Sequence, residues 1–147
     1  MTQEDIIKIF VGNQFKQFCL YSFVHDETNK KITLNLHRHE NMPYTCCKCG
    51  QQCLFAYDSL NSREVEDLPV TDLRLFYRFT PVRIYCPYCK TVHVEQIDGL
   101  SPHSRQTDRF KLFIARKCES TSVSAVAIEY HLNDDTVRRI DKEYLQK

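Results

Sequence analysis

The chain has 147 residues, of which 42% are hydrophobic, and its 20 Lys and Arg residues nearly balance 19 Asp and Glu residues. This balance excludes a strongly basic nucleic-acid coat protein and an acidic tail, although a locally basic surface remains compatible with it. Only three glycines are present and no phosphate-binding glycine motif occurs, so nucleotide-dependent chemistry is not expected. Because no apolar run could span a bilayer and two acidic residues stand where a basic leader would lie, we expect neither a membrane contact nor a signal peptide.

The first stretch, residues 1–40, is predicted to form a short helix and a β-hairpin. Apolar residues 6–11 follow two acidic residues, which suit the first turn of a helix. Two strand-like runs, 18–24 and 32–36, flank the polar segment 25–30. A hairpin is the simplest connection between them.

The second stretch, residues 41–100, is predicted to be a β-rich ribbon between two C-x-x-C pairs. The run 63–69 favours a strand that ends at a proline. In 73–80 apolar residues occupy every second position, which is typical of a half-buried strand. Residues 91–95 complete a hairpin across the second cysteine pair. A segment of this size buries little apolar surface, so a bound metal ion would supply much of its stability.

Cysteine usage indicates a metal site in this stretch. Eight cysteines in a chain without a leader favour free thiols, and hence a cytoplasmic protein. Pairs with two intervening residues let both sulfurs converge on one ion, which predicts a zinc site with the ligands Cys46, Cys49, Cys86 and Cys89. Gly50 eases the tight turn after the first pair, whereas Lys90 at the matching place is less suited to it. Four thiolates fill the coordination sphere, so we expect a structural ion and no catalysis.

Other interpretations of these residues stay open. A C-x-x-C pair can also be a redox dithiol, but two such pairs near one another favour metal. Cys53 stands at ligand spacing from Cys49, and His93 could replace a cysteine, although an exposed strand position suits it better. The cysteines outside the ligand set are expected to be small buried hydrophobic residues, namely Cys19, Cys47, Cys53 and Cys118.

The third stretch, residues 101–147, has helical periodicity. Thr107 can cap a helix whose apolar face carries Phe110, Phe113, Ile114 and Cys118. Two further short helices follow, with the small residue Ala127 where they approach and His131 in the turn, where glycine is usual. Asn133 or Asp134 would cap the second of these helices. The spacing is that of a helix-turn-helix, and its apolar set is Val126, Tyr130, Leu132, Val137 and Ile140.

In a DNA-binding helix-turn-helix the second helix enters the major groove. Its outward face would present Asn133, Asp135, Thr136, Arg138, Arg139 and Lys142. Arg138 and Arg139 are the expected base or phosphate contacts, with a merely solvated helix face as the alternative. Further phosphate contacts could come from Arg105, Arg109, Lys111, Arg116 and Lys117. On the predicted strands basic and aromatic residues interleave, which suits phosphate contact and a solvated face equally; these are Arg74, Arg78 and Arg83 with Phe76 and Tyr85.

The order of these parts resembles one known family. A hairpin, a C-x-x-C pair, a strand with Asp67-Leu68-Pro69, a basic aromatic strand, C-P-x-C and a helix-turn-helix ending in residues 135–145 are similar to the amino-terminal half of bacterial insertion-sequence transposases of the ISL-three type. The resemblance covers residues 18–147. It implies binding of the terminal inverted repeats of the element. In this family the acidic nuclease triad belongs to a separate, larger domain, which we do not expect within these residues.

We therefore expect an α+β chain with three parts: a helix and β-hairpin (1–40), a four-cysteine zinc ribbon (41–100) and a helix-turn-helix domain (101–147). The expected function is sequence-specific binding of double-stranded DNA without catalysis, and inverted repeats would favour a homodimer. The alternative is an interaction or inhibitory adaptor that binds a protein partner and has lost DNA affinity, or a stand-alone transcriptional regulator without catalysis. The near-neutral charge is compatible with both.

Overall fold

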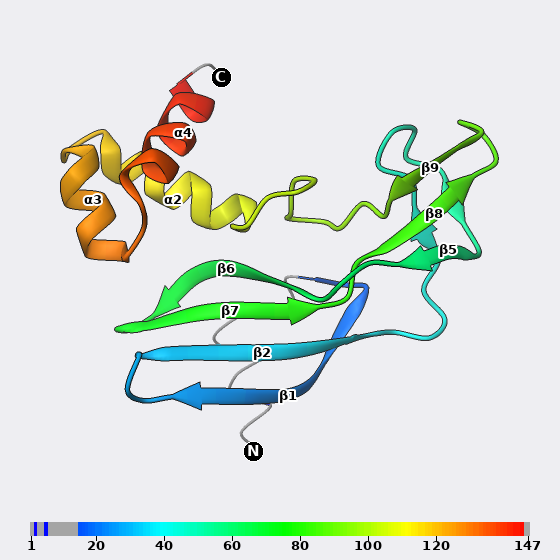
Figure 1. Cartoon of the computed structure of the whole chain (residues 1–147), viewed down its shortest axis with the longest axis horizontal. Coiled ribbons are helices and arrows are strands. Elements are labelled where there is room, and N and C mark those ends of the chain that lie inside the picture. The colour runs from blue at the N-terminus through cyan, green and yellow to red at the C-terminus, as the bar shows by residue number, and fades with distance from the viewer. Residues whose placement is uncertain (1, 3–4, 6–14, 146–147) are drawn as a thin grey trace. The chain divides into compact units, whose positions relative to one another are not determined.

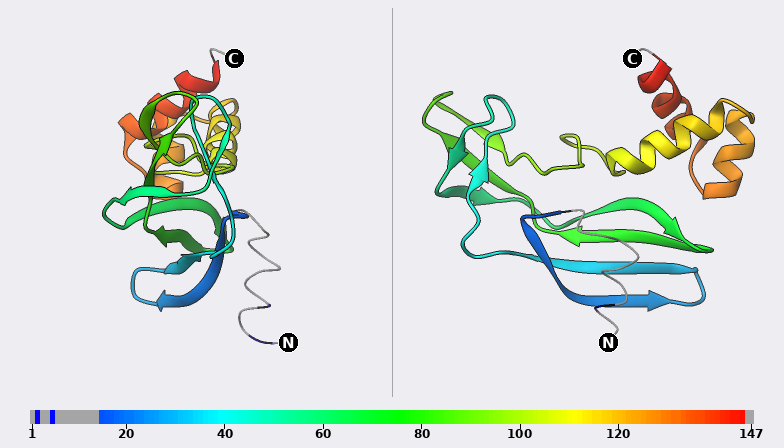
Figure 2. Two further views of the ribbon diagram at one scale, coloured as in Figure 1. Left: turned by 90° about the vertical axis from the view of Figure 1, so that its right-hand side faces the viewer. Right: turned by 180° about the vertical axis from the view of Figure 1, so that it is seen from behind.

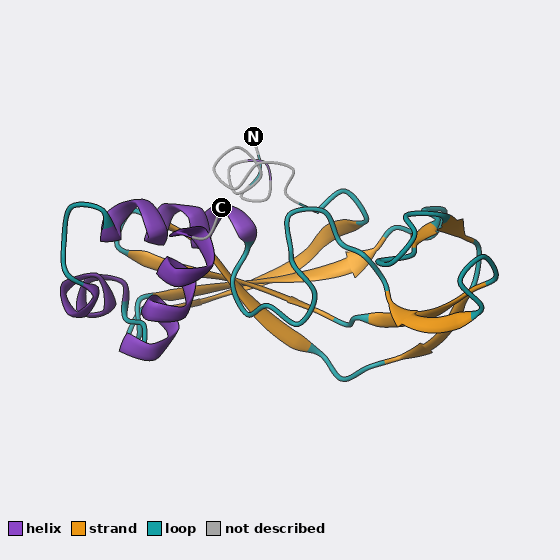
Figure 3. Ribbon diagram, turned by 90° about the horizontal axis from the view of Figure 1, so that it is seen from above, coloured by secondary structure: helices purple, strands orange, loops and turns teal. Residues whose placement is uncertain are grey.

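The computed structural model describes residues 2, 5 and 15–145, so the helix predicted over residues 6–11 lies outside the described residues. The chain forms two compact units, Met1–Thr107 and Asp108–Lys147. Strands occupy the first unit and three helices the second, which confirms the predicted α+β class (Figure 3).

The elements labelled in Figure 1 have the following bounds. The strands are β1 (Phe18–Asp26), β2 (Lys31–Arg38), β3 (Tyr44–Thr45), β4 (Gln52–Cys53), β5 (Ala56–Ser59), β6 (Arg63–Val70), β7 (Leu73–Phe79), β8 (Val82–Cys86) and β9 (Thr91–Val94). The helices are α2 (Asp108–Cys118), α3 (Val123–Tyr130) and α4 (Asp134–Leu145).

A four-stranded sheet with the order β1-β2-β7-β6 forms the larger part of the first unit (Figure 1). The predicted hairpin is confirmed, because β1 and β2 pair antiparallel. The pairing of β2 with β7 was not expected: the two strands run parallel and join segments that are far apart in the sequence. β6 and β7, expected in the ribbon, therefore extend the sheet of the amino-terminal hairpin. β6 also continues through Pro69, with a register shift between Asp67 and Val70.

The core of this sheet follows from the alternation in β7. Leu75, Tyr77 and Phe79 are buried, as the period-2 pattern predicted. They pack with Leu34 of β2 and Val65 of β6, which are also buried. Full burial of an aliphatic or aromatic side chain contributes about 1.5–3 kcal/mol, so these side chains hold the parallel and antiparallel pairs together.

A buried polar cluster lies at the irregular end of β6. The fully buried carboxylate of Asp67 accepts hydrogen bonds from Tyr77 Oη at 2.9 Å and from Thr107 Oγ1 at 2.7 Å. Glu66 N donates to the carbonyl of Arg105, and Thr107 N donates to the carbonyl of Glu66. Burial of a carboxylate requires such partners. They fix the chain segment before α2 against β6.

The remaining strands, β3, β4, β5, β8 and β9, form a second part of the first unit, called from here on the ribbon. β3 pairs with β4, and β5, β8 and β9 form a three-stranded sheet. The right-hand view of Figure 2 has these strands gathered beyond one end of the four-stranded sheet. Ile84 is fully buried at the centre of the ribbon and packs with Cys46, Cys53 and Cys86.

The second unit is a three-helix unit. The fully or almost fully buried side chains of Phe110 and Ile114 on α2, Val126 on α3, and Val137 and Ile140 on α4 form its core. Phe113 and Tyr130 add an edge-to-face ring contact with centroids 5.2 Å apart. No helix in the described part of the chain is both long and apolar enough to cross a membrane.

Candidate metal centre and nucleic-acid interface

Two tight turns of the ribbon bring the four predicted ligands together. Cys46 and Cys49 lie in the turn between β3 and β4, whereas Cys86 is the last residue of β8 and Cys89 lies in the turn between β8 and β9. The four sulfur atoms all lie within 4.8 Å of one another. The structure thus brings together two segments that are distant in the sequence.

The two turns share a backbone pattern. Gly50 N donates to the carbonyl of Cys46 at 2.9 Å, and Lys90 N donates to the carbonyl of Cys86 at 2.7 Å. Gly50 (φ 76°) and Lys90 (φ 58°) both adopt the left-handed conformation. Lysine pays a steric cost there that glycine avoids, which agrees with the expectation that the second turn is the less favourable one.

The distances between the sulfurs fit a tetrahedral ion. Cys46 Sγ lies 3.9 Å from Cys89 Sγ, and Cys49 Sγ lies 3.5 Å from Cys86 Sγ. Four sulfurs at ~2.3 Å from a tetrahedral zinc ion would be about 3.8 Å apart. The donor set therefore suits one divalent ion that accepts thiolate ligands.

Electrostatics in this cluster also favour a cation. Burial acts to raise the pKa of Cys86, but hydrogen bonds from Cys89 N and from the Cys49 side chain lower that pKa to about 6. The Cys49 side chain, together with burial, raises the pKa of Cys89 to about 12. Because the sulfurs are so close, they cannot all ionise unless a positive charge lies among them. A divalent ion would supply that charge and displace the protons.

The cysteines outside the ligand set have different environments. Cys53 is buried beside Ile84, as expected, whereas Cys47 and Cys118 are only half-buried. Cys19 is exposed, so the expectation that it is a buried hydrophobic residue was wrong. It lies on β1, which is an edge strand among the described strands of its sheet.

His93 and Glu95 follow the second pair. The His93 ring lies 2.5 Å from Thr91 Oγ1, and His93 is absent from the sulfur cluster. The Glu95 carboxylate is almost fully buried and pairs with Arg38 at 2.5 Å. The Arg38 guanidinium also lies 3.9 Å from the ring centroid of Tyr44. This pair connects β2 to the ribbon, and no sequence pattern had indicated it.

The turn of the helix-turn-helix is defined by three local interactions. Ser122 caps α3 by accepting a hydrogen bond from Ala125 N. His131, at the position where glycine is usual, takes the left-handed conformation (φ 57°). Leu132 N then donates to the carbonyl of Ala127 at 2.9 Å, and Asn133 Oδ1 accepts from Asp135 N at 2.8 Å. Asn133 is thus the cap of α4, one of the two alternatives predicted.

The two faces of α4 differ sharply. Val137 and Ile140 are buried, so positions three and four residues apart on the opposite side point away from the core. These positions carry the exposed residues Asp135, Arg138, Arg139 and Lys142. Asn133 is exposed at the start of the helix and Thr136 is half-buried. Arg138 pairs with Asp135 at 3.4 Å, but both side chains are largely exposed.

Basic residues of α2 are less available for DNA contact than the sequence suggested. Lys111 is buried and its ammonium bonds Glu143 at 3.2 Å, so the expectation that it contacts phosphate was wrong. A helical pattern could have shown this, because Lys111 neighbours Phe110 and Ile114 on the buried face. Arg109 is half-buried.

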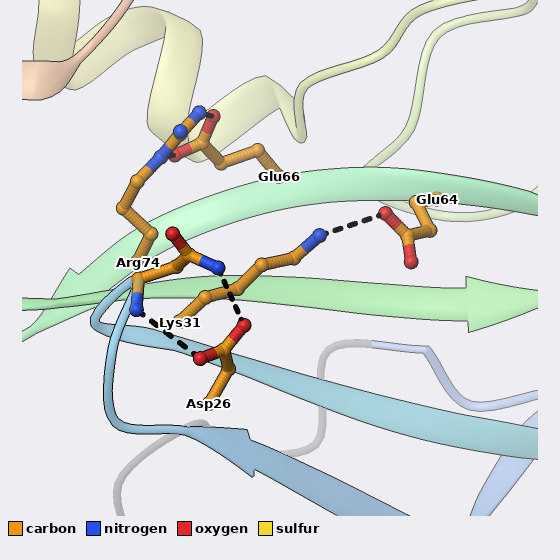
Figure 4. Close-up of polar contacts among 6 residues, drawn as sticks. Asp26, Lys31, Glu64, Glu66 and Arg74 are labelled. Atoms are coloured by element: carbon orange, nitrogen blue, oxygen red, sulfur yellow. Dashed lines mark hydrogen bonds and ion pairs between the residues drawn. The ribbon is translucent and has the colours of Figure 1, made fainter.

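The basic residues of the strands also carry partners. Arg74 forms two hydrogen bonds with the Glu66 carboxylate, at 3.0 and 2.8 Å, and Lys31 pairs with Glu64 (Figure 4). Arg83 pairs with Asp58. Arg78 is exposed on the same strand as Arg74.

Residues 95–145 match the family model for the helix-turn-helix domain of transposase family ISL3. The likeness to ISL3-type transposases is confirmed. Over 101 residues, which is 69% of this chain, the sequence is 30% identical to the transposase for insertion sequence element IS1001 of Bordetella parapertussis. That similarity spans about a quarter (25%) of the length of the IS1001 transposase. No solved structure matches the chain. The residues matched by the family model include α2, α3 and α4.

Proposed function

We propose that this chain recognises double-stranded DNA at the ends of an insertion sequence, with α4 in the major groove and a structural Zn²⁺ ion in the ribbon. The observation that carries the proposal is the exposed basic face of α4 on a helix-turn-helix of ISL3 type. The similarity to the IS1001 transposase supports the end-recognition role. We assign no catalytic step to these residues.

Arg138 and Arg139 are the proposed principal contacts. The ion pair of Arg138 with Asp135 is exposed on both sides, and such pairs contribute about 0–1 kcal/mol, so Arg138 can exchange it for a base or a phosphate at little cost. Asn133, Thr136 and Lys142 complete the proposed α4 surface. An arginine that reads a base discriminates by about 1–3 kcal/mol.

Contacts from the other elements are secondary in this proposal. Arg78 is exposed and is proposed to contact phosphate. Arg74 would first have to leave Glu66, and Arg109 is half-buried, so both are weaker candidates. Residues 101–147 carry only nine basic against seven acidic residues. We therefore expect modest affinity that falls steeply with salt.

The ribbon has a structural role in this proposal. A Cys₄ site leaves no open coordination position for water or substrate, so the ion would hold the two turns together. Zn²⁺ is the divalent ion that best suits four thiolates at this spacing. Free thiols require a reducing compartment, and the cytoplasm is the proposed location.

Fluorescence anisotropy with the terminal sequence of the element and a scrambled duplex of equal length tests the proposal. We expect tighter binding to the terminal sequence and a linear fall of log affinity with log salt. Replacing Arg138 and Arg139 by Ala should weaken specific binding by about 5–150-fold, which corresponds to ~1–3 kcal/mol. Lys30→Ala serves as the control, because it removes a positive charge outside the proposed surface. Equal affinity of the double variant and the unaltered chain would reject the assignment.

An adaptor function is the second candidate. It is favoured by the net charge of +1 and by the pairing of Arg74 and Arg83 with carboxylates. In that case the same titration would remain flat at low salt with both duplexes, while the zinc content and the fold stay intact.

A further inference from the structure

The ribbon carries an exposed apolar groove that neither the metal site nor the helix-turn-helix uses. It has a volume of about 430 Å³ and is formed by β4, β5 and the turn after β8. Five large side chains around it are 49–80% exposed: Leu54, Phe55, Tyr57, Tyr85 and Tyr88. Exposed apolar patches of this kind mark interaction sites in soluble proteins.

The size of the patch fits a protein interface. Aromatic side chains carry about 150–250 Å² each, so five large side chains exposed to this degree present on the order of 600 Å². A standard protein–protein interface buries about 800 Å² on each partner. The groove and its rim therefore supply most of one such surface.

The charge of the groove argues against DNA as its occupant. The residues that line it include no charged side chain. Beside the groove, Asp58 is paired with Arg83, whose guanidinium lies 5.7 Å from the ring centroid of Tyr57. Surfaces that bind single strands combine stacked aromatic rings with a positively charged path for the backbone. Here the rings are present, but none of the residues that line the groove carries a positive charge.

An uncharged apolar surface is complementary to itself. Two copies related by a twofold axis would bring identical patches together. A charged patch would then repel its copy, whereas this uncharged patch would not. The edge of the ribbon sheet supports the same partner. β9 is the other edge strand of this sheet, and the segment just after it is held by a hydrogen bond from Gln96 N to the carbonyl of Thr45 and by the bridge between Cys46 and Glu95. β5 pairs with β8 alone among the described strands.

An open strand edge next to an apolar patch is a template for a second identical strand. We propose that the groove around Phe55 and Tyr88, with the open edge of β5, is the contact between two copies of this chain in a twofold dimer. The proposal concerns the ribbon alone and is independent of how α4 contacts DNA.

Sedimentation velocity of the zinc-loaded full chain without DNA, over a range of concentrations, tests this directly. We expect a reversible monomer–dimer equilibrium. Phe55→Lys and Tyr88→Lys should each place like charges against one another in the dimer and weaken dimerisation at least tenfold. Val24→Lys is the matched control, because Val24 is an exposed apolar residue of β1 outside the groove, and it should dimerise like the unaltered chain. Zinc content and circular dichroism should be the same for all four proteins.

A monomer at every concentration, or a dimer that both groove variants leave intact, would overturn the proposal. A monomeric chain whose DNA affinity falls with Phe55→Lys would also overturn it and would make the groove a nucleic-acid surface. Dimerisation without specific DNA binding would retain this inference while rejecting the proposed function.

Discussion

Replacing Cys86 by Ser offers the sharpest test of the metal centre. The Cys86 side chain is fully buried, its sulfur lies 3.5 Å from Cys49 Sγ, and it accepts a hydrogen bond from Cys89 N. Structural zinc contributes about 10–16 kcal/mol of apparent folding free energy, and an equal share for each of four ligands is about 2.5–4 kcal/mol. Single domains have total stabilities of only ~5–15 kcal/mol. We therefore expect the ribbon of the variant to be largely unfolded.

The assay combines zinc content per chain with hydrogen exchange. The unaltered protein should hold one zinc ion, and Cys86→Ser should lose it together with amide protection in β3, β4, β8 and β9. Helices α2 to α4 belong to the other compact unit and should keep their protection. Cys19→Ser is the matched control, because the same substitution at an exposed thiol should leave the zinc content unchanged. A Cys86→Ser chain that retains one zinc ion and its ribbon protection would refute the ligand assignment.

Three further predictions concern the helical unit, and thermal unfolding followed by circular dichroism checks each. Ala127→Leu should destabilise it by about 1–3 kcal/mol, because Ala127 is buried where α3 meets α4 and a larger side chain overpacks that contact. An unchanged midpoint would show that the contact between α3 and α4 can accommodate a leucine side chain. His131→Gly should stabilise the unit by about 1 kcal/mol, because residue 131 has a left-handed backbone conformation that glycine adopts without steric cost. A lower unfolding midpoint would contradict this turn geometry. Lys111→Ala should lower the midpoint, because it removes a buried stem and leaves Glu143 unpaired, yet the salt dependence of DNA binding should not change. A shallower salt slope would instead restore Lys111 as a phosphate contact.

The parts of the fold that local spacing determines were predictable. Two C-x-x-C pairs specify their own turns, and the structure brings Cys46, Cys49, Cys86 and Cys89 within 4.8 Å. The helix-turn-helix is equally local, because its cap, its small residue and its left-handed turn lie within a dozen residues. The β1–β2 hairpin was predictable for the same reason.

The parts of the fold that depend on contacts between segments distant in the sequence could not be predicted. Nothing in the pattern of β7 distinguishes a partner in the ribbon from β2, since a half-buried strand alternates in either place. The buried carboxylates of Asp67 and Glu95 were hidden for a related reason. Acidic residues on a strand suggest a solvent-exposed face until their partners Tyr77 and Arg38 are known. The exposure of Cys19 and the burial of Lys111 likewise follow from which face of an element packs.

The parallel pairing of β2 with β7 has a consequence for how this chain can evolve. The ribbon is made of two excursions from the four-stranded sheet, residues 39–62 between β2 and β6 and residues 80–95 after β7, and each contributes half of the sulfurs. Neither excursion could be cut out, transplanted or duplicated as a self-sufficient module. Any homologue that loses one cysteine pair would be expected to lose the other as well, so ribbon and sheet must be inherited together.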